Sequence, residues 1–315
     1  MFEKAVLILL PIFLIIALGY VFERAALFGE RAASVLARFV TEVALPMLLF
    51  GALASESFDK IFNHPFVISF SLATLVCFLL PWVLLPGRDV SLQRRAMRAM
   101  GATYSGVSFI GLPLLQPLIG KVTLPAVAVA NVIVLLVMAV AILMIELSRS
   151  EGHGSARALG TALLHTFKTP LVFATVGGVA YSFAGLPLPH FIYQTTHLIG
   201  IATPAVALLA LGGALVHTRL SHFTEVGVLS AVKLLAMPMV TIAVLLWFFP
   251  DIDHKWAVAA VVLAAMPTAV IEYLLADEYH EYTEEASGLV LGTTLLSGLT
   301  VPFFVVLSMH LWPLE

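Results

Sequence analysis

Glycine, serine, threonine and proline interrupt two long apolar runs of this chain, and these interruptions hold the residues best suited to bind a ligand. The first is the richer, with seven small or helix-breaking residues: Gly101, Thr103, Ser105, Gly106, Ser108, Gly111 and Pro113. The second contains Met266, Pro267 and Thr268 near the middle of another apolar run. Proline lacks a backbone N–H and its ring clashes with the carbonyl four residues back, so each segment should break a helix. The freed backbone groups must then find partners in protein, water or a ligand.

A helix that begins inside an apolar environment presents unpaired N–H groups and partial positive charge, which favours an anion. Two breaks at matching positions of two halves are typical of a transport site. The alternative is that these residues only kink their helices, because glycine and proline are common in membrane helices. Further prolines inside apolar runs illustrate that alternative: Pro46, Pro81, Pro204, Pro238 and Pro302.

Ionisable and amide side chains inside apolar runs are functional candidates, because each is costly at depth. Glu272 follows Pro267 by about one and a half helical turns and is a candidate for proton or ion coupling. Lys233 would attract a carboxylate substrate, pair with Glu272, or extend to the membrane surface. Asn131 would supply an amide to the interrupted segments or bond between helices.

Glu42 is a second candidate for coupling, because it lies close to Pro46. Its simpler interpretation is an ion pair with Arg38, four residues earlier on the same helix. The sequence alone leaves both interpretations open.

The elements that would position these residues are membrane-spanning helices. The chain has 61% hydrophobic and 11% charged residues, whereas soluble domains carry about 25% charged residues. Apolar runs of about 20 residues recur along the whole length, and each is long enough to cross a bilayer. We expect an all-α integral membrane protein of about ten helices, at residues 5–22, 32–54, 65–85, 96–119, 122–147, 170–186, 191–216, 226–249, 255–276 and 285–311.

Loop lysines and arginines predict the orientation. Alternate loops on one side hold ten of them: Arg24, Arg31, Arg88, Arg94, Arg95, Arg98, Arg149, Arg157, Lys168 and Arg219. The other side holds four: Lys4, Lys60, Lys121 and Lys255. This bias predicts that the first side is cytoplasmic and that both termini lie on the non-cytoplasmic side.

The two halves of the chain, residues 1–169 and 170–315, show similar patterns of proline and tryptophan along five spans each. Because five is odd, the second half would enter the membrane from the opposite side. Such an inverted repeat is a common plan of secondary transporters. The broken spans are then the fourth and the ninth, at matching positions.

Sequence signatures of enzymes are missing from the chain. It has no glycine-rich phosphate loop with a lysine and no paired-histidine zinc helix. The segment from Gly106 to Gly111 has one residue too many for a nucleophile elbow. We therefore expect no catalytic activity, no metal and no cofactor, and no basic aromatic surface suggests nucleic acid.

The two interrupted segments also resemble a known family. Gly106-Val-Ser-Phe-Ile-Gly-Leu-Pro-Leu114 resembles the fourth-span signature of the auxin efflux carrier family. Met266-Pro-Thr-Ala-Val, with Tyr273-Leu-Leu-Ala276 and Tyr279, resembles its ninth-span signature. This family includes plant PIN auxin exporters and bacterial permeases for malonate, malate and similar organic acids. It belongs to the bile-acid, arsenite and auxin type of transporters.

The resemblance implies a fixed scaffold of spans 1, 2, 6 and 7 and a mobile transport domain of spans 3–5 and 8–10. Crossed, unwound spans 4 and 9 would hold the substrate in the mobile domain. The chain departs from the pattern at three positions. Many members have asparagine where Gly106 and Ile271 stand, and a small residue where Glu272 stands.

We therefore expect a secondary transporter of a small organic anion, such as malonate, that works by elevator-type alternating access. It would be coupled to a proton or Na⁺, or be a uniporter, and act as a homodimer in the inner membrane. The candidate substrate-binding residues are Ser105, Gly106, Ser108, Gly111, Pro113, Asn131, Pro267, Thr268 and Lys233; Glu272 and Glu42 are the coupling candidates. The alternatives are an organic-anion channel, or a membrane sensor without transport.

Overall fold

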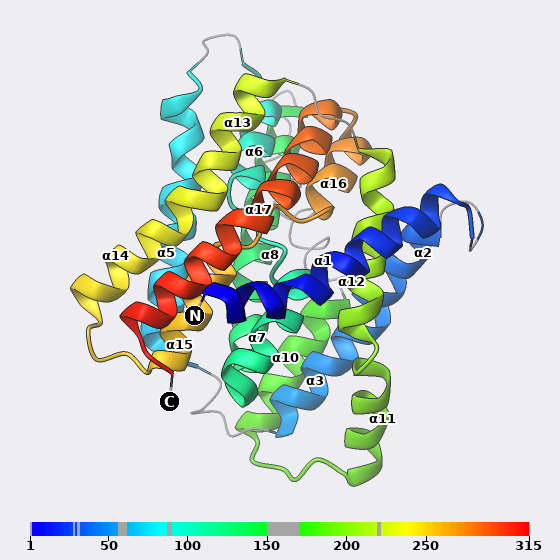
Figure 1. Ribbon diagram of the computed structural model, residues 1–315, viewed down its shortest axis with the longest axis vertical. Coiled ribbons are helices and arrows are strands. Elements are labelled where there is room, and N and C mark those ends of the chain that lie inside the picture. Colours follow the sequence, from blue (N-terminus) through cyan, green and yellow to red (C-terminus); the bar gives the residue numbers. More distant parts are fainter. Residues whose placement is uncertain are drawn as a thin grey trace.

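The computed structural model describes residues 2–27, 29, 32–55, 62–86, 90–149, 170–218 and 222–314. Every named element in these residues is a helix (Figure 1). Within these described ranges, six helical stretches are long and apolar enough to cross a membrane: Ala32–Ser55, His64–Leu84, Val107–Ser148, His190–Ala214, Phe223–Phe248 and Thr283–Leu311. An all-helical chain with about six candidate spans is confirmed, while the count of ten and the inverted repeat stay predictions.

The helices of the first half follow one another closely. They are α1 (Phe2–Arg24), α2 (Ala32–Phe39), η1 (Val40–Ala44), α3 (Leu45–Ser55), α5 (His64–Leu84), α6 (Leu92–Gly101), η2 (Val107–Gly111), α7 (Leu112–Ile119), η3 (Gly120–Val122) and α8 (Thr123–Arg149). Polar caps start two of them. Asn63 Oδ1 accepts a hydrogen bond from Phe66 N–H at the start of α5, and Ser91 Oγ accepts from Arg94 N–H at the start of α6.

The second half is built in a similar way. Its helices are α10 (Pro170–Phe183), α11 (His190–Gly200), α12 (Thr203–Ala214), η4 (Leu215–His217), α13 (Phe223–Ala231), η5 (Val232–Ala236), α14 (Met237–Phe248), α15 (His254–Ala264), α16 (Ile271–Tyr279) and α17 (Thr283–Leu311). Asp253 caps α15 by accepting from the N–H groups of Lys255 and Trp256. The two ends of the described chain lie close together in all three views.

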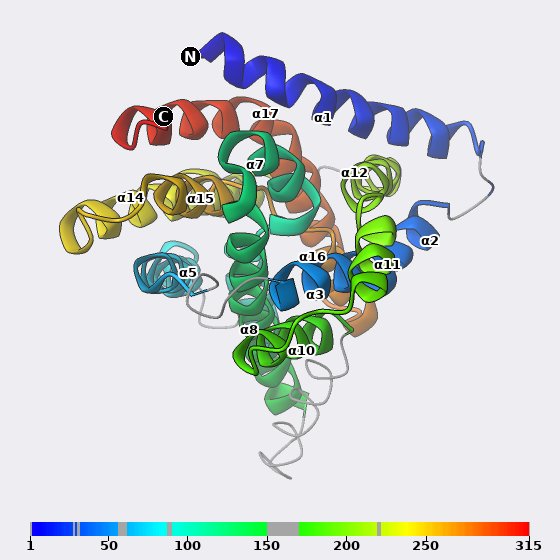
Figure 2. The same ribbon diagram turned by 90° about the horizontal axis from the view of Figure 1, so that it is seen from below.

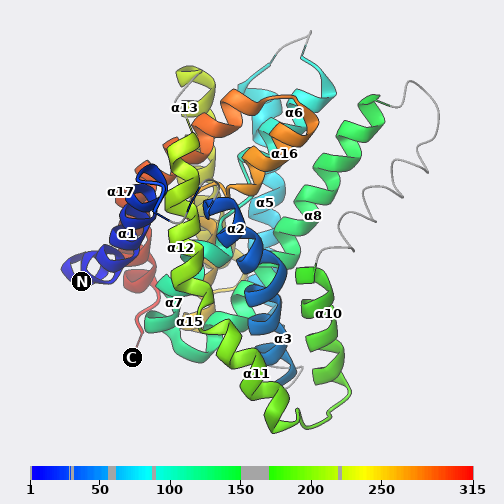
Figure 3. The ribbon, with the colours of Figure 1, turned by 90° about the vertical axis from the view of Figure 1, so that its right-hand side faces the viewer.

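The helices gather into two groups by their closest packing. One group contains α1, α2, α3, α10, α11 and α12, and the other contains α5, α6, α8 and α13 to α17. Figure 2 shows α2, α11 and α12 on one side and α5, α14 and α15 on the other, and Figure 3 shows α3 beside α10. The groups meet where α12 packs on η2, α17 on α1 and α8 on α3.

Glycine allows the backbones of α1 and α12 to touch in the first group. A Cβ atom on Gly212 would lie 1.9 Å from Ile16 O, and one on Gly19 would lie 2.2 Å from Leu209 O. Small residues at such a crossing are the usual means of close packing between membrane helices.

We expect Gly212→Ala to lower the thermal unfolding temperature of the purified protein, because the added methyl group meets backbone that cannot move aside. Overpacking of this kind costs about 1–3 kcal/mol. The matched control is Gly227→Ala in α13, where an added Cβ meets nothing within 4 Å. That variant should unfold at the same temperature or higher, since alanine favours a helix over glycine. Equal effects of the two substitutions would contradict the tight crossing.

Three helices contain a π-helical turn that ends two residues before a proline. The turns are η1 before Pro46, η2 before Pro113 and η5 before Pro238. In η1 and η5 the residue that precedes the proline bonds five residues back, from Leu45 N–H to Val40 O and from Met237 N–H to Val232 O. The wider turn accommodates a proline that would otherwise clash with the carbonyl four residues back. At these prolines the hydrogen bonding therefore changes from four to five residues back, and the helix continues.

Part of the predicted orientation depends on loop residues outside the described part of the chain. These are Arg31, Lys60, Arg88, Arg157, Lys168 and Arg219. The predicted sidedness of the termini stays a prediction.

Candidate functional site: two interrupted helices that cross

The two interrupted segments cross and join through their backbones. Helix α6 ends at Gly101 and η2 begins at Val107, while α15 ends at Ala264 and α16 begins at Ile271. Gly106 N–H donates to Pro267 O (2.8 Å) and Ala269 N–H donates to Tyr104 O (3.1 Å), which forms an antiparallel bridge between Ser105 and Thr268. In Figure 1, α6 and α16 lie near the top and α7 and α15 near the bottom, so the two broken spans run in opposite directions.

The first interruption is shorter than the sequence suggested. It lies between Gly101 and Val107, and from Val107 onward the chain is helical through Pro113. Pro113 is the second residue of α7, directly after the π-helical turn that also contains Gly111. The expectation that Pro113 breaks this helix is therefore wrong, because the wider π-helical turn η2 in front of it accommodates the proline ring and the helix continues.

Thr268 ties the crossing to two neighbouring helices. Its Oγ1 donates to Gly101 O (2.8 Å), the last carbonyl of α6, and its N–H donates to Thr293 Oγ1 (3.1 Å) of α17. Ser105, the opposite member of the bridge, is also buried, and its Oγ lies 3.9 Å from Met237 Sδ. The hydroxyl groups thus gather at the point where the backbones cross.

Asn131 lies beside the crossing and bonds to it. Its Nδ2 donates to Ser108 Oγ (2.7 Å) of η2 and to Val127 O (2.9 Å) of its own helix α8. Of the two interpretations given to this residue, the structure shows a hydrogen bond between helices. That bond also places an amide next to the start of η2, where Ser108 and Gly106 lie.

Lys233 is fully buried, with an exposed fraction of 0%. Its Nζ donates to Ala264 O (2.8 Å), the last carbonyl of α15, and lies 3.4 Å from Met237 Sδ. The interpretation that Lys233 extends to the membrane surface is wrong, because the π-helical turn η5 directs the side chain to the break in the ninth span. The pairing with Glu272 is also wrong, since no ion pair between them occurs among the described residues.

Glu272 lies in the first turn of α16 and is also fully buried. Within the described part of the chain, neither carboxylate oxygen has a hydrogen-bond partner. An added Cβ on Gly101 would lie 3.2 Å from Glu272 Oε1, so the carboxyl group sits beside the end of α6. A buried carboxyl group without a partner is costly in its ionised form.

Glu42 differs from Glu272 in both burial and bonding. It belongs to η1 and its Oε1 accepts from Arg38 Nε (3.2 Å), with side chains 50% and 76% exposed. This is the simple ion pair within one helix that the spacing allowed. The described contacts of Glu42 do not reach the crossing.

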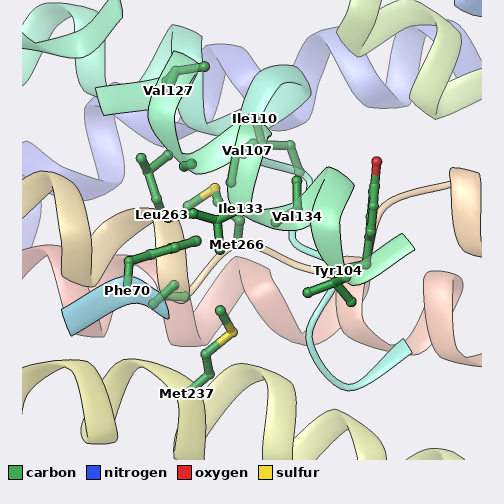
Figure 4. Packing of buried hydrophobic residues seen from close by; sticks show 14 of the residues in the cluster. Phe70, Tyr104, Val107, Ile110, Val127, Ile133, Val134, Met237, Leu263 and Met266 are labelled. Carbon is green, nitrogen blue, oxygen red and sulfur yellow. The ribbon is translucent and has the colours of Figure 1, made fainter. Parts of the chain in front are cut away.

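The apolar side chains around the crossing come from both interrupted spans and from their neighbours. Figure 4 shows Val107 and Ile110 of η2 facing Leu263 and Met266 at the end of α15, with Met237 of α14 below them. All five are buried. The few polar groups of the crossing therefore lie in an apolar surround, where electrostatic interactions are stronger than in water.

A second polar cluster, which the sequence analysis did not single out, joins α6, α13 and α17. Glu225 accepts hydrogen bonds from Arg98 Nε (2.8 Å) and Nη2 (2.7 Å) and from Tyr282 Oη (2.6 Å). Arg94 bridges Glu225 and Glu285. The sequence did contain a sign of this cluster. Arg94 and Arg98 lie four residues apart on one helix face, and the acids Glu225 and Glu285 lie in the first turns of α13 and α17. The cluster connects α6 with the turn that follows α16, and so with both interrupted spans.

Comparisons with known proteins agree with this arrangement. The sequence profile of a family described as "Membrane transport protein" matches residues 5–305. An uncharacterized transporter of Escherichia coli, YfdV, is 26% identical over 307 residues, which cover 95% of this chain and 96% of the relative. A putative malonate transporter of Rhizobium meliloti is 27% identical over 300 residues, which cover 93% of this chain and 92% of the relative. An uncharacterized transporter of Methanothermobacter thermautotrophicus is 24% identical over 305 residues.

Proposed function

Because the chain belongs to the membrane transport protein family, we propose that it is a secondary transporter that carries a small organic anion by an elevator-type mechanism. One observation carries the proposal above the others. Two interrupted helices cross inside an apolar surround, with hydroxyl groups, an amide and an ammonium group beside their backbones. The name of the putative malonate transporter makes a dicarboxylate such as malonate the first substrate to test.

The proposed binding site uses the starts of the two second half-helices, η2 and α16. Helix starts favour anions, because their N–H groups carry partial positive charge. Hydroxyl and amide groups would hold the anion's oxygens, Gly111 and the two prolines would shape the backbone around it, and Lys233 would make the site electropositive. The proposed set is Ser105, Gly106, Ser108, Gly111, Pro113, Asn131, Pro267, Thr268 and Lys233.

Glu272 is the proposed coupling carboxylate, with a proton or Na⁺ as the coupling ion. Its burial and its lack of a described partner support this role. A buried carboxylate is costly, so it would need a bound proton or cation while the site moves from one side of the membrane to the other. Glu42 is the alternative carboxylate. Uniport, without any coupling ion, is the remaining mode.

The proposed elevator divides the chain as its helices pack. The group of α1, α2, α3, α10, α11 and α12 would be the scaffold, and the group that holds the crossing would slide against it. Each half of the chain, residues 1–169 and 170–315, would contribute to both bodies. We propose a homodimer in the cell membrane that is held together by the scaffold.

The transport proposal is tested with purified protein in liposomes and labelled malonate, then other small organic acids. A carrier gives saturable uptake, and unlabelled substrate trapped inside accelerates the entry of label. Single-channel currents that rise linearly with concentration would instead identify a channel. Failure to take up any organic anion, with folded protein in the liposomes, would overturn the proposal.

A crosslink between the two proposed bodies should stop transport reversibly. An added Cβ on Gly298 of α17 would lie 3.6 Å from the Phe13 ring of α1, across the proposed boundary. In a Cys77→Ala background, cysteines at both positions joined by a short bifunctional thiol reagent should abolish malonate uptake until the link is cleaved.

The matched control has the same geometry inside the scaffold. An added Cβ on Gly177 of α10 would lie 3.8 Å from the Phe50 ring of α3. Crosslinked cysteines at these two positions should leave uptake unchanged. Full turnover with the Phe13–Gly298 crosslink formed would argue against a sliding domain.

A further inference from the structure

We infer that the Lys233 ammonium group is a resident cation of the crossing, held at the carbonyl end of α15 in the place where a dissolved cation would otherwise be needed. This inference rests on the proposed transport function and deepens it. It gives Lys233 the role of binding the backbone of the broken helix. Any exchangeable coupling ion would then bind somewhere other than the end of α15.

The end of α15 requires donors because the last four carbonyl groups of any α-helix lack partners within the helix. At this end, Ala265 N–H donates to Val261 O (3.0 Å) and Met266 N–H donates to Leu263 O (3.4 Å). The final carbonyl, that of Ala264, accepts from Lys233 Nζ at 2.8 Å. The lysine thus bonds to the last carbonyl of the helix at the break.

The end of α6, the corresponding half-helix of the other broken span, is completed without any charge. Among the described residues, its last four carbonyls accept hydrogen bonds from neutral backbone N–H and hydroxyl groups alone. The pairs are Ala102 N–H to Arg98 O, Thr103 Oγ1 to Ala99 O, Thr103 N–H and Tyr104 N–H to Met100 O, and Thr268 Oγ1 to Gly101 O. A hydroxyl group is therefore sufficient for this task, and in our inference the ammonium group at α15 adds a positive charge that hydrogen bonding alone does not require.

The backbone partly offsets that charge. In the part of the chain that the structure describes, Lys233 forms no ion pair with a carboxylate. Its described hydrogen-bond partners are the Ala264 carbonyl and the Met237 thioether, the Cys77 thiol of α5 also lies near it, and its side chain is fully buried. A helix end carries partial negative charge, equivalent to about half an electron, which favours a cation there. Carbonyl oxygens at such an end are also the usual ligands of Na⁺ in transporters with broken helices.

The test uses two variants that lack the ammonium group. One leaves space that a dissolved cation could fill, and the other does not. Lys233→Ala removes the charge and opens room beside Ala264 O, which Na⁺ or ethylammonium would occupy but the larger choline ion would not. Lys233→Met removes the charge and keeps the space filled, and it should fold, because replacing a buried charge with an apolar side chain of similar volume is often neutral. Both variants are compared with the unchanged protein in choline chloride, NaCl and ethylammonium chloride at equal ionic strength.

Two readouts are measured, namely thermal unfolding of the purified protein and uptake of labelled malonate by liposomes. In choline, both variants should lose uptake by roughly tenfold or more, because the crossing loses both the hydrogen bond to Ala264 O and the positive charge. Na⁺ and ethylammonium should raise the unfolding temperature of Lys233→Ala more than that of the unchanged protein, and should restore part of its uptake. Neither ion should help Lys233→Met.

Three results would overturn the inference. They are wild-type uptake by Lys233→Met in choline, equal rescue of both variants, and no effect of Na⁺ or ethylammonium on the stability of Lys233→Ala. Should Lys233→Ala not fold, the uptake of Lys233→Met in choline decides alone. The proposed function fails separately, when the unchanged protein transports no organic anion, and the unfolding measurement still tests the resident cation in that case.

Discussion

Gly106→Leu is expected to abolish uptake while the protein still reaches the membrane in normal amounts. Gly106 N–H donates to Pro267 O, and an added Cβ would lie 3.4 Å from that same oxygen. The branched remainder of a leucine side chain would enter the crossing, where the substrate is proposed to bind. Because the side chain would fill the space of the substrate, uptake should fall below detection, whereas the overpacking lowers the stability of the fold by about 1–3 kcal/mol. Labelled-malonate uptake, normalised to the amount of protein in the membrane, measures the effect.

Gly106→Ala is the control for backbone effects at the same position. Gly106 has a φ of −73°, which any residue can adopt, and a methyl group there makes only ordinary van der Waals contact. Alanine should therefore retain most of the uptake. Normal uptake by the leucine variant would remove Gly106 from the substrate site.

Glu272→Gln is expected to retain substrate exchange but to lose accumulation driven by a pH gradient. Glutamine keeps the shape of the protonated carboxyl group and cannot release a proton. Exchange of labelled for unlabelled malonate needs no net movement of the coupling ion, whereas accumulation does. Both are measured in the same liposomes, with and without an imposed pH difference.

Glu42→Gln makes the same chemical change at a half-exposed carboxylate that pairs with Arg38. It should leave both exchange and accumulation unchanged. If Glu272→Gln accumulates malonate with the unchanged pH profile, the Glu272 carboxyl group is structural. A loss of accumulation by Glu42→Gln would then make Glu42 the coupling carboxylate.

The positions of the helices could be predicted well from the sequence, because long apolar runs bounded by charged or turn-forming residues leave little choice in a bilayer. The two interruptions were also predicted, within Gly101 to Pro113 and at Pro267. Their extent was not, because proline alone does not tell a broken helix from one that widens its turn. Pro113 illustrates the difficulty, since it was expected to break a helix and lies inside a helical stretch, directly after the π-helical turn η2.

The side-chain partners in the crossing could not be predicted to the same degree. Spacing within one helix was sufficient for the Arg38–Glu42 pair, which is local. Lys233 bonds to Ala264 across 31 positions of sequence, and Glu225 to Arg98 across 127, so both depend on how separate helices pack. Lys233 was a candidate because of its charge in an apolar run, but its partner follows from the π-helical turn that holds it.

That turn also affects how relatives of this chain should be aligned. A π-helical turn contains one residue more than an α-helical turn, so everything after it is rotated by about 100° relative to an uninterrupted α-helix. In η5 the extra residue and Pro238 together set the face on which the second part of the span, α14, meets α5 and α15. A relative without this proline preserves the same faces only if it is also one residue shorter in the turn. A gap of a single position inside a membrane span, next to a missing proline, is therefore the evolutionary trace that η1, η2 and η5 would leave.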